Sequence, residues 1–490
     1  MARSQCKINV QFMRQDEPGT ALSWSNPTAL CIIFAIGSFD PCRNSRVTCL
    51  SEIVPAIRKG VLLVVGPRTL LLPVRVAVRE IDARLLLGLA AAERGFRVLI
   101  GAEADILTHP QPGLFLSHTL RNGRASMEAH RLGHVVAAFD EEALVRFPDP
   151  VQNRRLDRDI FAVPRLLLAW GLANADYWKG LDGYRGTPIE ITGNCRGDLL
   201  RPDVRGVYTE EVGGLRERFG RFVLINTNFS FVNHFDPAFY RTADLPAGLV
   251  AHKAVLMQEF LKLVPALATA IAPAHLVLRP HPSEDWRAWR QAAHGQTNVT
   301  VLNEGSIVPW LMAADCVVHN GCTSAVEAAM LGRQAFAFRP VSAPDYDLEL
   351  PNALSRQFAT RPALVEAVRE TLTGAETGQV DERLLGHHVA ARDGLLASDR
   401  MADALSKVLS DPGQTRSPSK RFWAFGRKAI YGIGTSFPLT RRLRYVAHLA
   451  RGLGGSELVD KVEGFRRVTG RFRDVRAQIV GRTVLLEGRG

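Results

Sequence analysis

Short apolar strands alternate with amphipathic helices along most of this chain, and that alternation constrains its fold more than any other feature. The segment TLLLPVRVAV, from Thr69, predicts a strand, and DARLLLGLAAAERG, from Asp82, predicts a capped helix that ends at Gly95. Strand FRVLIG follows, and similar segments continue to PIEITG, with a helix expected near residues 163–175. Strands joined by helices of this length are typical of a parallel, doubly wound sheet.

A second series of the same kind begins at strand RFVLIN, residues 221–226. Its later strands include HLVLRP, VTVLN and CVVH, with one helix near residues 251–270 and another from Thr323 or Ser324. At 490 residues the chain is long enough for two such domains. We therefore expect an α/β protein of two Rossmann-like domains that face a central cleft, plus a basic C-terminal extension. The expected boundaries are 1–66 for an N-terminal extension without an assigned role, 67–205 and 206–410 for the two domains, and 411–490 for the C-terminal extension.

The net charge of +12 is confined to this C-terminal extension. Residues 416–490 hold 17 Lys and Arg against 5 Asp and Glu, whereas residues 1–415 hold 44 of each. Between Leu439 and Leu453 the apolar residues fall on one helical face and the arginines elsewhere. Such a basic amphipathic helix suits an anionic membrane surface, and a helix packed on the domain is the alternative. No recognition motif for nucleic acid accompanies the charge, so nucleic acid is not an expected partner.

Cysteine usage and hydropathy favour a cytoplasmic protein. Four of the seven cysteines lie in the first 50 residues, without the spacing of metal ligands. This scatter is typical of a reducing compartment. No run of about 18 uncharged apolar residues predicts a spanning helix, and the apolar run Thr28 to Phe39 lacks the length and flanks of a secretory signal. We expect a cytoplasmic location, peripheral on the inner face of the cytoplasmic membrane if the extension binds lipid.

Polar loops follow three strands of the second series. Thr227 and Asn228 follow RFVLIN, Arg279 lies at the end of HLVLRP and His281 follows it, and the segment from Asn320 through Gly321 and Thr323 to Ser324 follows CVVH. Because the carboxyl ends of parallel strands meet at one crevice, these loops are expected to face a common ligand. The last loop also feeds a helix N-terminus, whose N–H groups and dipole suit a phosphate.

Two side chains near these loops have both a functional and a structural interpretation. Glu327, one turn into the helix, is placed to reach ribose hydroxyls, and the alternative is a capping box with Ser324. His281 lies between two prolines at a strand end, where a fixed imidazole can donate a hydrogen bond to a phosphoryl oxygen. A purely structural histidine is the alternative.

Several motifs in combination resemble a known family. The RPHP element and the later HNGCTSAVEAAMLG run resemble the C-terminal half of GT-B glycosyltransferases and of nucleotide-sugar 2-epimerases. Together with LPVRVAVREIDARLLLGLAAAERGFRVLIG, ITGNCRGDLLRP, LINTNFSFVNH and DLELPNALS, they resemble the bacterial surface carbohydrate biosynthesis protein family. The resemblance covers roughly Thr69 to Ser355. Cys195 departs from it, because proline is expected at that place in the interdomain connector.

The resemblance implies a GT-B glycosyltransferase of surface polysaccharide biosynthesis that works without a metal or another cofactor. It implies transfer of a sugar from a nucleotide-activated donor, with a CMP- or CDP-linked donor favoured over a uridine one, to a glycan or lipid-linked acceptor. Carried over by position, it places the donor phosphate at Asn320, Gly321, Thr323 and Ser324, the ribose at Glu327, and a phosphate oxygen at His281. The tripeptide Asp345-Tyr346-Asp347 matches a metal-binding pattern, but such tripeptides are common and no metal is expected.

A catalytic base is expected from the first domain, across the cleft. Glu80 is the first candidate to deprotonate an acceptor hydroxyl and Asp82 the second, although Asp82 is equally well explained as a helix N-cap. The acidic run Asp140 to Glu142 is a weaker candidate, because such clusters at strand ends are usually solvated. Two further hypotheses compete with transfer: a UDP-sugar 2-epimerase, and a non-catalytic GT-B module that docks a polysaccharide assembly complex.

Overall fold

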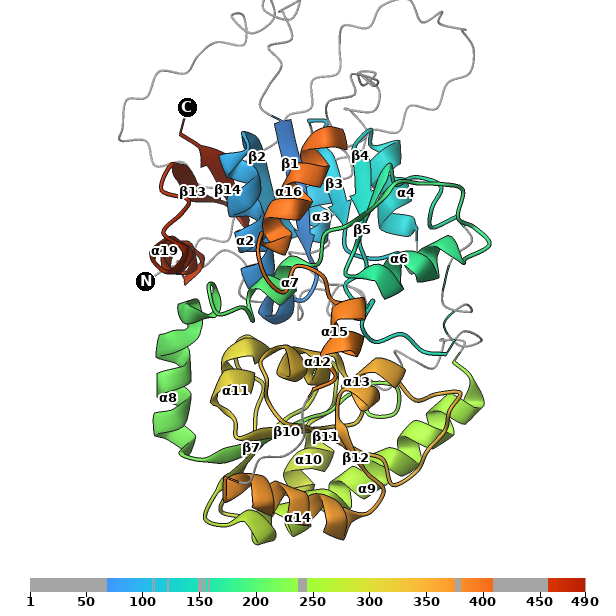
Figure 1. The fold of residues 1–490 in the computed structure, drawn as a ribbon, viewed down its shortest axis with the longest axis vertical. Coiled ribbons are helices and arrows are strands. Elements are labelled where there is room, and N and C mark those ends of the chain that lie inside the picture. Colours follow the sequence, from blue (N-terminus) through green and yellow to red (C-terminus); the bar gives the residue numbers. More distant parts are fainter. Residues whose placement is uncertain are drawn as a thin grey trace, which may run out of the picture. The chain divides into compact units, whose positions relative to one another are not determined.

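The structure is a computed structural model that describes residues 68–107, 109, 111–120, 123–148, 152, 156, 159–236, 245–374, 380–408 and 457–489. Two separate sheets organise these residues (Figure 1). The predicted N-terminal extension, residues 1–66, lies outside the described part of the chain. So does the predicted amphipathic helix between Leu439 and Leu453.

The N-terminal sheet has the order β13-β14-β2-β1-β3-β4-β5-β6, in which β1 to β6 run parallel. The order reverses between β1 and β3, as the doubly wound prediction requires. The polypeptide forms this sheet because its strands are nearly continuous apolar runs that helices cover on both faces. The bounds are β1 Arg68–Val74, α2 Ala77–Glu93, β2 Phe96–Ala102, α3 Glu103–Leu107, β3 Leu114–Ser117, α4 Arg124–Arg131, β4 Val135–Ala138, β5 Leu166–Ala169, α6 Leu172–Lys179, β6 Ile189–Ile191 and α7 Cys195–Asp198.

The C-terminal sheet has the order β12-β11-β10-β7-β8-β9 and is parallel throughout. Its order reverses between β7 and β10. The prediction of two Rossmann-like domains is therefore confirmed. The bounds are α8 Thr209–Phe219, β7 Phe222–Asn226, α9 Ala247–Ile271, β8 His275–Arg279, α10 Arg287–Ala292, β9 Val299–Val301, α11 Ile307–Ala313, β10 Cys316–His319, α12 Thr323–Met330, β11 Ala335–Phe338, α13 Glu349–Ala353, β12 Arg356–Phe358, α14 Arg361–Leu372, α15 Glu382–His388 and α16 Ala397–Val408.

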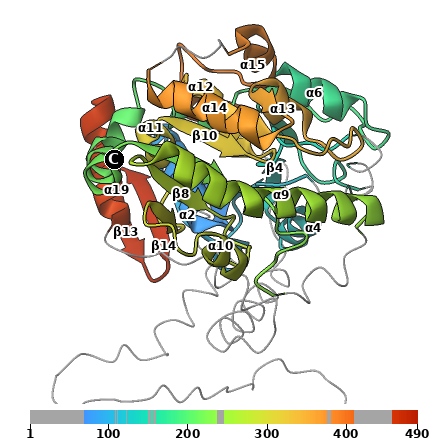
Figure 2. The same ribbon diagram turned by 90° about the horizontal axis from the view of Figure 1, so that it is seen from below.

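Helix α9 is the one helix in the described ranges that is long and apolar enough to cross a membrane. It lies beside α14 on one face of the C-terminal sheet (Figure 2). Its inward side chains, among them Phe260, Leu263 and Leu267, are fully buried against β7 and β8. This packing explains its apolar character as that of a core helix.

Two element predictions in the first domain are wrong. Helix α2 begins at Ala77, five residues before the predicted start at Asp82, and Val76 occupies its N-cap position. The apolar segment around Val76 fits either a strand or a buried helix, so periodicity did not locate the boundary. Residues 163–175 form strand β5 and the start of α6 rather than one helix. The run Leu166–Ala169 is fully buried between β4 and β6, where an apolar run of this length forms a strand.

The C-terminal extension differs most from its prediction. Residues 457–489 form helix α19 (Glu457–Thr469) and a hairpin of β13 (Val475–Val480) and β14 (Thr483–Gly488), and β14 pairs antiparallel with β2. Figure 1 shows α19 and the hairpin beside α2. Helix α16, at the end of the range 206–410 predicted for the second domain, also packs on α2. These segments carry buried apolar side chains that need the N-terminal sheet as their partner.

Most of the net positive charge of the extension lies in residues that the structure does not describe. The described residues 457–489 hold 8 Lys and Arg against 5 Asp and Glu, whereas residues 416–456 hold 9 and none. The membrane-surface role stays a prediction, and only residues 416–456 have the charge that it needs.

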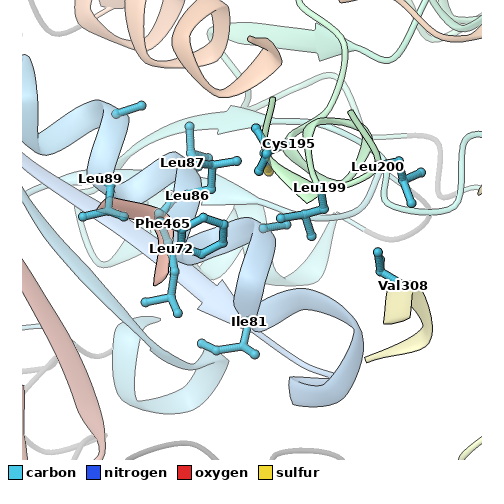
Figure 3. Packing of buried hydrophobic residues seen from close by; sticks show 14 of the residues in the cluster. Leu72, Ile81, Leu86, Leu87, Leu89, Cys195, Leu199, Leu200, Val308 and Phe465 are labelled. Atoms are coloured by element: carbon cyan, nitrogen blue, oxygen red, sulfur yellow. The ribbon is translucent and has the colours of Figure 1, made fainter. Parts of the chain in front are cut away.

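We expect Phe465→Ala to lower the free energy of unfolding by about 3–5 kcal/mol, because it removes a fully packed aromatic ring. Phe465 is 1% exposed in a cluster with Leu72 and Leu86 (Figure 3). Urea unfolding followed by circular dichroism measures the effect. Val480→Ala, at an exposed site on β13, is the control and should change stability by less than about 0.5 kcal/mol. Equal midpoints for the two variants would mean that α19 is dispensable for the N-terminal sheet.

Candidate functional site

A cavity of about 290 Å³ lies at the carboxyl ends of β7, β8 and β10. The loops after these strands form one wall, and Val76, Arg79, Glu142 and Arg196 from the N-terminal part form another. Strands β7 and β10 are neighbours, and the strand order reverses between them. Ligands of open α/β sheets bind at such reversal points. Seven of the residues predicted to bind the donor line this cavity: Thr227, Asn228, Arg279, His281, Thr323, Ser324 and Glu327.

The other two predicted residues, Asn320 and Gly321, support the wall without lining the cavity. The Asn320 amide oxygen accepts the backbone N–H of Asn228 at 2.9 Å, and its amide nitrogen donates to the Asn228 carbonyl at 3.2 Å. Gly321 has a φ of +83°, and its N–H donates to His319 Nδ1 at 3.0 Å. Only glycine adopts this left-handed φ without strain. These contacts hold the loop after β10 against the loop after β7.

Glu284 is a buried carboxylate that joins two of the loops, and the sequence did not indicate it. It is 2% exposed. It accepts hydrogen bonds from the Thr227 hydroxyl at 2.9 Å, the Phe229 N–H at 2.9 Å, the His281 N–H at 3.2 Å and the Trp289 indole at 3.0 Å. Burial raises the pKa of Glu284, and these donors oppose that shift by stabilising the anion. The carboxylate thereby fixes the loops after β7 and β8 to each other.

His281 presents a neutral imidazole to the cavity. Burial and, to a smaller extent, the nearby Arg79 cation lower its pKa to about 4. The Ser283 N–H donates to Nδ1 at 3.2 Å, so the neutral ring carries its proton on Nε2. In the described residues Nε2 has no hydrogen-bond partner, and the ring lines the cavity. His281 can therefore donate one hydrogen bond to a ligand oxygen at neutral pH.

Two buried cations line the cavity without a carboxylate in contact among the described residues. Arg279 donates to the carbonyls of Glu304 at 2.6 Å and Gly305 at 3.1 Å, and its guanidinium lies over the Trp310 ring. Burial lowers the pKa of Arg279 to about 9. Lys253, from α9, is 3% exposed. Burial lowers its pKa to about 8. The sequence indicated Arg279 as a donor-binding residue but did not indicate Lys253.

Glu327 forms a buried ion pair with Arg196, which neither sequence interpretation anticipated. The two side chains are 6% and 4% exposed. Burial disfavours the Arg196 cation, but Glu327 and Glu141 outweigh this and raise its pKa. The capping-box interpretation is wrong, since Cys322 is the N-cap residue of α12 and the Ser324 hydroxyl contacts the Cys322 thiol. Because Arg196 lies in α7, the pair connects the interdomain connector to the wall of the cavity.

We expect Glu327→Ala to lower the free energy of unfolding by about 3–5 kcal/mol, because it leaves Arg196 buried without its counter-charge. The double variant Arg196→Met with Glu327→Met should recover most of that loss, since an apolar pair of similar volume needs no hydration. Urea unfolding of the three proteins measures both effects. If Glu327→Ala is as stable as the unsubstituted protein, the ion pair does not hold the connector.

Neither of the two predicted bases, Glu80 and Asp82, lines the cavity, and their catalytic role stays a prediction. Glu80 is 1% exposed. It accepts the Arg75 N–H at 2.9 Å and pairs with Arg79 at 3.5 Å. Burial would raise its pKa, but Arg79 and the other cations outweigh it and lower the pKa. Asp82 accepts the Tyr208 hydroxyl at 2.8 Å and pairs with Lys461 of α19 at 3.1 Å. Glu80 therefore binds groups at the start of α2, whereas Asp82 joins α2 to Tyr208 and to α19.

Glu142 is the carboxylate from the N-terminal sheet that does line the cavity, and it pairs with Arg79. The expectation that the run Asp140 to Glu142 is solvated is wrong. Asp140 is 7% exposed and Glu141 is 1% exposed. The Asp140 carboxylate accepts the Glu142 N–H at 3.1 Å, which fixes the turn after β4. This turn directs Glu142 toward the site.

A second cavity, of about 440 Å³, shares Glu142 and Phe147 with the first. Its other walls carry carboxylates, amides and an aromatic ring that Arg146 covers at 4.2 Å: Asp140, Gln152, Asn174, Asp176, Tyr177 and Glu349. Side chains of these kinds form hydrogen bonds with hydroxyl groups and stack on the apolar faces of sugars. Glu142 therefore stands where the two cavities meet.

The Asp345-Tyr346-Asp347 tripeptide is not arranged as a metal site. The Asp347 carboxylate accepts hydrogen bonds from Arg339 at 2.5 Å and from the Ala343 N–H at 3.0 Å. Burial alone would raise the pKa of Asp347. Its contacts with His252 and Arg339 outweigh burial and hold the pKa below its usual range. No group of three metal-ligating side chains occurs in the ranges that the structure describes. Activity without a metal stays a prediction.

No protein-family model matches this sequence, and no curated protein does. Among solved structures, the wall teichoic acid polymerase TagF is similar with a TM-score of 0.42 and 10% identity, over 61% of this chain and 73% of that one. The Methanocaldococcus jannaschii UDP-GlcNAc 2-epimerase in complex with UDP-GlcNAc and UDP has a TM-score of 0.46 and 11% identity, over 69% and 99%. A UDP complex of MnaA from S. aureus has a TM-score of 0.43 and 14% identity, over 71% and 99%. At these values the similarity carries no conclusion about reaction or substrate.

Proposed function

We propose that this protein is a glycosyltransferase of surface polysaccharide biosynthesis, which transfers a sugar from a nucleotide-activated donor to a glycan or lipid-linked acceptor. One observation supports this most strongly. The cavity at the order reversal of the C-terminal sheet combines a helix N-terminus, buried cations and a neutral histidine donor. These groups suit the phosphate of a nucleotide. A second cavity with groups suited to hydroxyls adjoins it through Glu142.

In this proposal Glu142 is the general base. Its carboxylate takes the proton of an acceptor hydroxyl while that oxygen forms a bond to the anomeric carbon of the donor sugar. The bond between that carbon and the donor phosphate oxygen breaks, and the nucleotide leaves with the electron pair. The Nε2–H of His281 and the buried cations stabilise the charge on the leaving phosphate. Arg79 holds the Glu142 carboxylate at the junction of the two cavities.

Thermal unfolding with CMP, CDP, UDP and GDP tests the donor site. A nucleotide at about 100 times its dissociation constant stabilises a protein by roughly 2.7 kcal/mol. We propose that cytidine nucleotides stabilise it most. If none of the four raises the melting temperature, the nucleotide-sugar proposal fails.

A product assay then separates the competing functions. Transfer from the donor to a glycan or lipid-linked acceptor supports the glycosyltransferase. Interconversion of the free nucleotide sugar would identify an epimerase, and nucleotide binding without turnover would identify a docking module. The cavity gives the epimerase little support, because in the described chain only two carboxylates line it, Glu142 and Glu327, and Glu327 forms a buried pair with Arg196.

A further inference from the structure

Lys253 is a buried cation whose position in the fold needs a ligand to explain it. It lies on the inward face of α9 and lines the cavity together with Cys322, Thr323 and Ser324 at the start of α12. It is 3% exposed, and no hydrogen bond or ion pair engages its ammonium group in the described chain. A charge removed from water without a partner destabilises a folded protein. Its retention inside a cavity indicates a partner that arrives from outside.

The other charged groups of the cavity are already engaged. Arg79 pairs with Glu142, and Arg196 pairs with Glu327. The Arg279 guanidinium donates to backbone carbonyls after β9. Among the described residues that line the cavity, Lys253 is therefore the cation with all of its donors unused. The hydroxyl side chains Thr323 and Ser324, at the start of α12, line the same cavity and suit a phosphate.

We propose that Lys253 binds a phosphoryl oxygen of the cavity's ligand and so makes this site selective for nucleotides over nucleosides. The proposal rests on the proposed function, and it assigns the contact that recognises the donor's phosphate. Lys253 is on this view a binding residue that pairs with the leaving group and takes no proton from the acceptor.

Phosphate binding should depend on pH, because Lys253 binds a phosphate only when its amino group is protonated. Burial lowers its pKa to about 8, although Asp347, Cys322 and Glu284 oppose the shift. These three groups face it from the loop after β11, the loop after β10 and the loop after β8. A phosphate bound to the ammonium group favours the charged form, so binding near pH 8.5 takes up a proton. The affinity for nucleotides should fall as pH rises from 7 to 9.5.

The same burial predicts an unusual effect on the empty protein. The folded pKa of Lys253 lies below that of the unfolded chain, so the charged side chain opposes folding at neutral pH, and this opposition is relieved as pH rises above about 8. Lys253→Met should therefore raise the melting temperature of the free protein at pH 7, by about 2–4 °C. A lysine with a purely structural role would give the opposite sign.

Isothermal titration calorimetry on the full chain tests the proposal with CDP, UDP, the nucleosides cytidine and uridine, and inorganic pyrophosphate. Lys253→Met should weaken CDP, UDP and pyrophosphate roughly ten- to a hundredfold at pH 7, as expected for the loss of a hydrogen bond to a charged group. It should leave the nucleosides unchanged and abolish proton uptake near pH 8.5. Lys262→Met removes the same charge from an exposed position on α9 and is the matched control, with no expected change.

The outcomes distinguish the role proposed for Lys253 from the proposed function of the protein. Unchanged phosphate affinity in Lys253→Met, with nucleotides still bound, would overturn the role of Lys253 and leave the proposed function standing. If proton uptake persists in Lys253→Met, the group that takes up the proton is Arg279. Burial lowers the pKa of Arg279 to about 9. Pyrophosphate binding that depends on Lys253, without binding of any nucleotide, would support the lysine and overturn the proposed function. Binding of neither would overturn both.

Discussion

Glu142→Gln should lower transferase turnover by about a hundredfold or more and leave donor binding unchanged. The amide keeps the shape of the side chain but cannot take the proton of an acceptor hydroxyl, and general base catalysis contributes about 10²–10⁴ to a rate. Glu142 qualifies because it lines both cavities, whereas Glu80 and Asp82 line neither. Steady-state turnover, with the donor affinity measured separately by calorimetry, shows whether the loss is in the chemical step.

Two further variants make this result specific. Glu366→Gln removes a carboxylate at an exposed position on α14 and should leave turnover unchanged. Glu80→Gln should disturb the contacts with Arg75 and Arg79 and act mainly on stability. If Glu80→Gln abolishes turnover at normal stability while Glu142→Gln remains active, the base is the residue that the sequence favoured, and the cavity does not contain the reacting groups.

Glu284→Ala is expected to lower the free energy of unfolding by about 3–5 kcal/mol and to abolish measurable nucleotide binding. The substitution leaves four donors near Thr227, Phe229, His281 and Trp289 without their acceptor. Each unsatisfied buried group costs about 1–3 kcal/mol, and part of the sum is recovered by relaxation and water. Urea unfolding and calorimetry with the best nucleotide measure the two effects.

Asp285→Ala is the matched control for this loss. Asp285 is the next residue, and its carboxylate pairs with the exposed Arg287 at 2.5 Å. Exposed ion pairs contribute about 0–1 kcal/mol, so this variant should remain close to the unsubstituted protein. If Glu284→Ala still binds nucleotide with normal affinity, the loops after β7 and β8 keep their geometry without the carboxylate.

The sequence allowed the strands and their loops to be predicted because both are encoded locally. An apolar run such as Cys316–His319, followed by Asn320 and Gly321, predicts a buried strand that ends at a polar loop. Parallel pairing then brings β7, β8 and β10 together, and seven of the nine predicted donor residues line one cavity. Those predictions needed only two facts: strands and helices alternate along the chain, and the carboxyl ends of parallel strands meet at one crevice.

The roles of single charged residues could not be predicted, since each depends on a partner far away in the sequence. Glu284 looks like part of a surface turn in PSEDW, yet it is the most highly bonded acceptor between the loops. Asp82 looks like a helix cap but meets Lys461 of α19. Lys253 did leave a signal: it lies four residues after Leu249 and three before Leu256, both buried, so it interrupts the apolar face of α9. A single lysine among the buried positions of a helix indicates a buried binding site.

The pairing of β14 with β2 also has a consequence for the order in which the chain is made. Strand β2 is synthesised early, and its outer edge stays unpaired until the ribosome has reached Gly488. The N-terminal sheet is therefore completed only after residues 483–488 have been made, although its six parallel strands are synthesised much earlier. An open edge is prone to pairing with another chain. Nascent chains that stall before the hairpin should be the main aggregating species, and chaperones that shield strand edges should act on them.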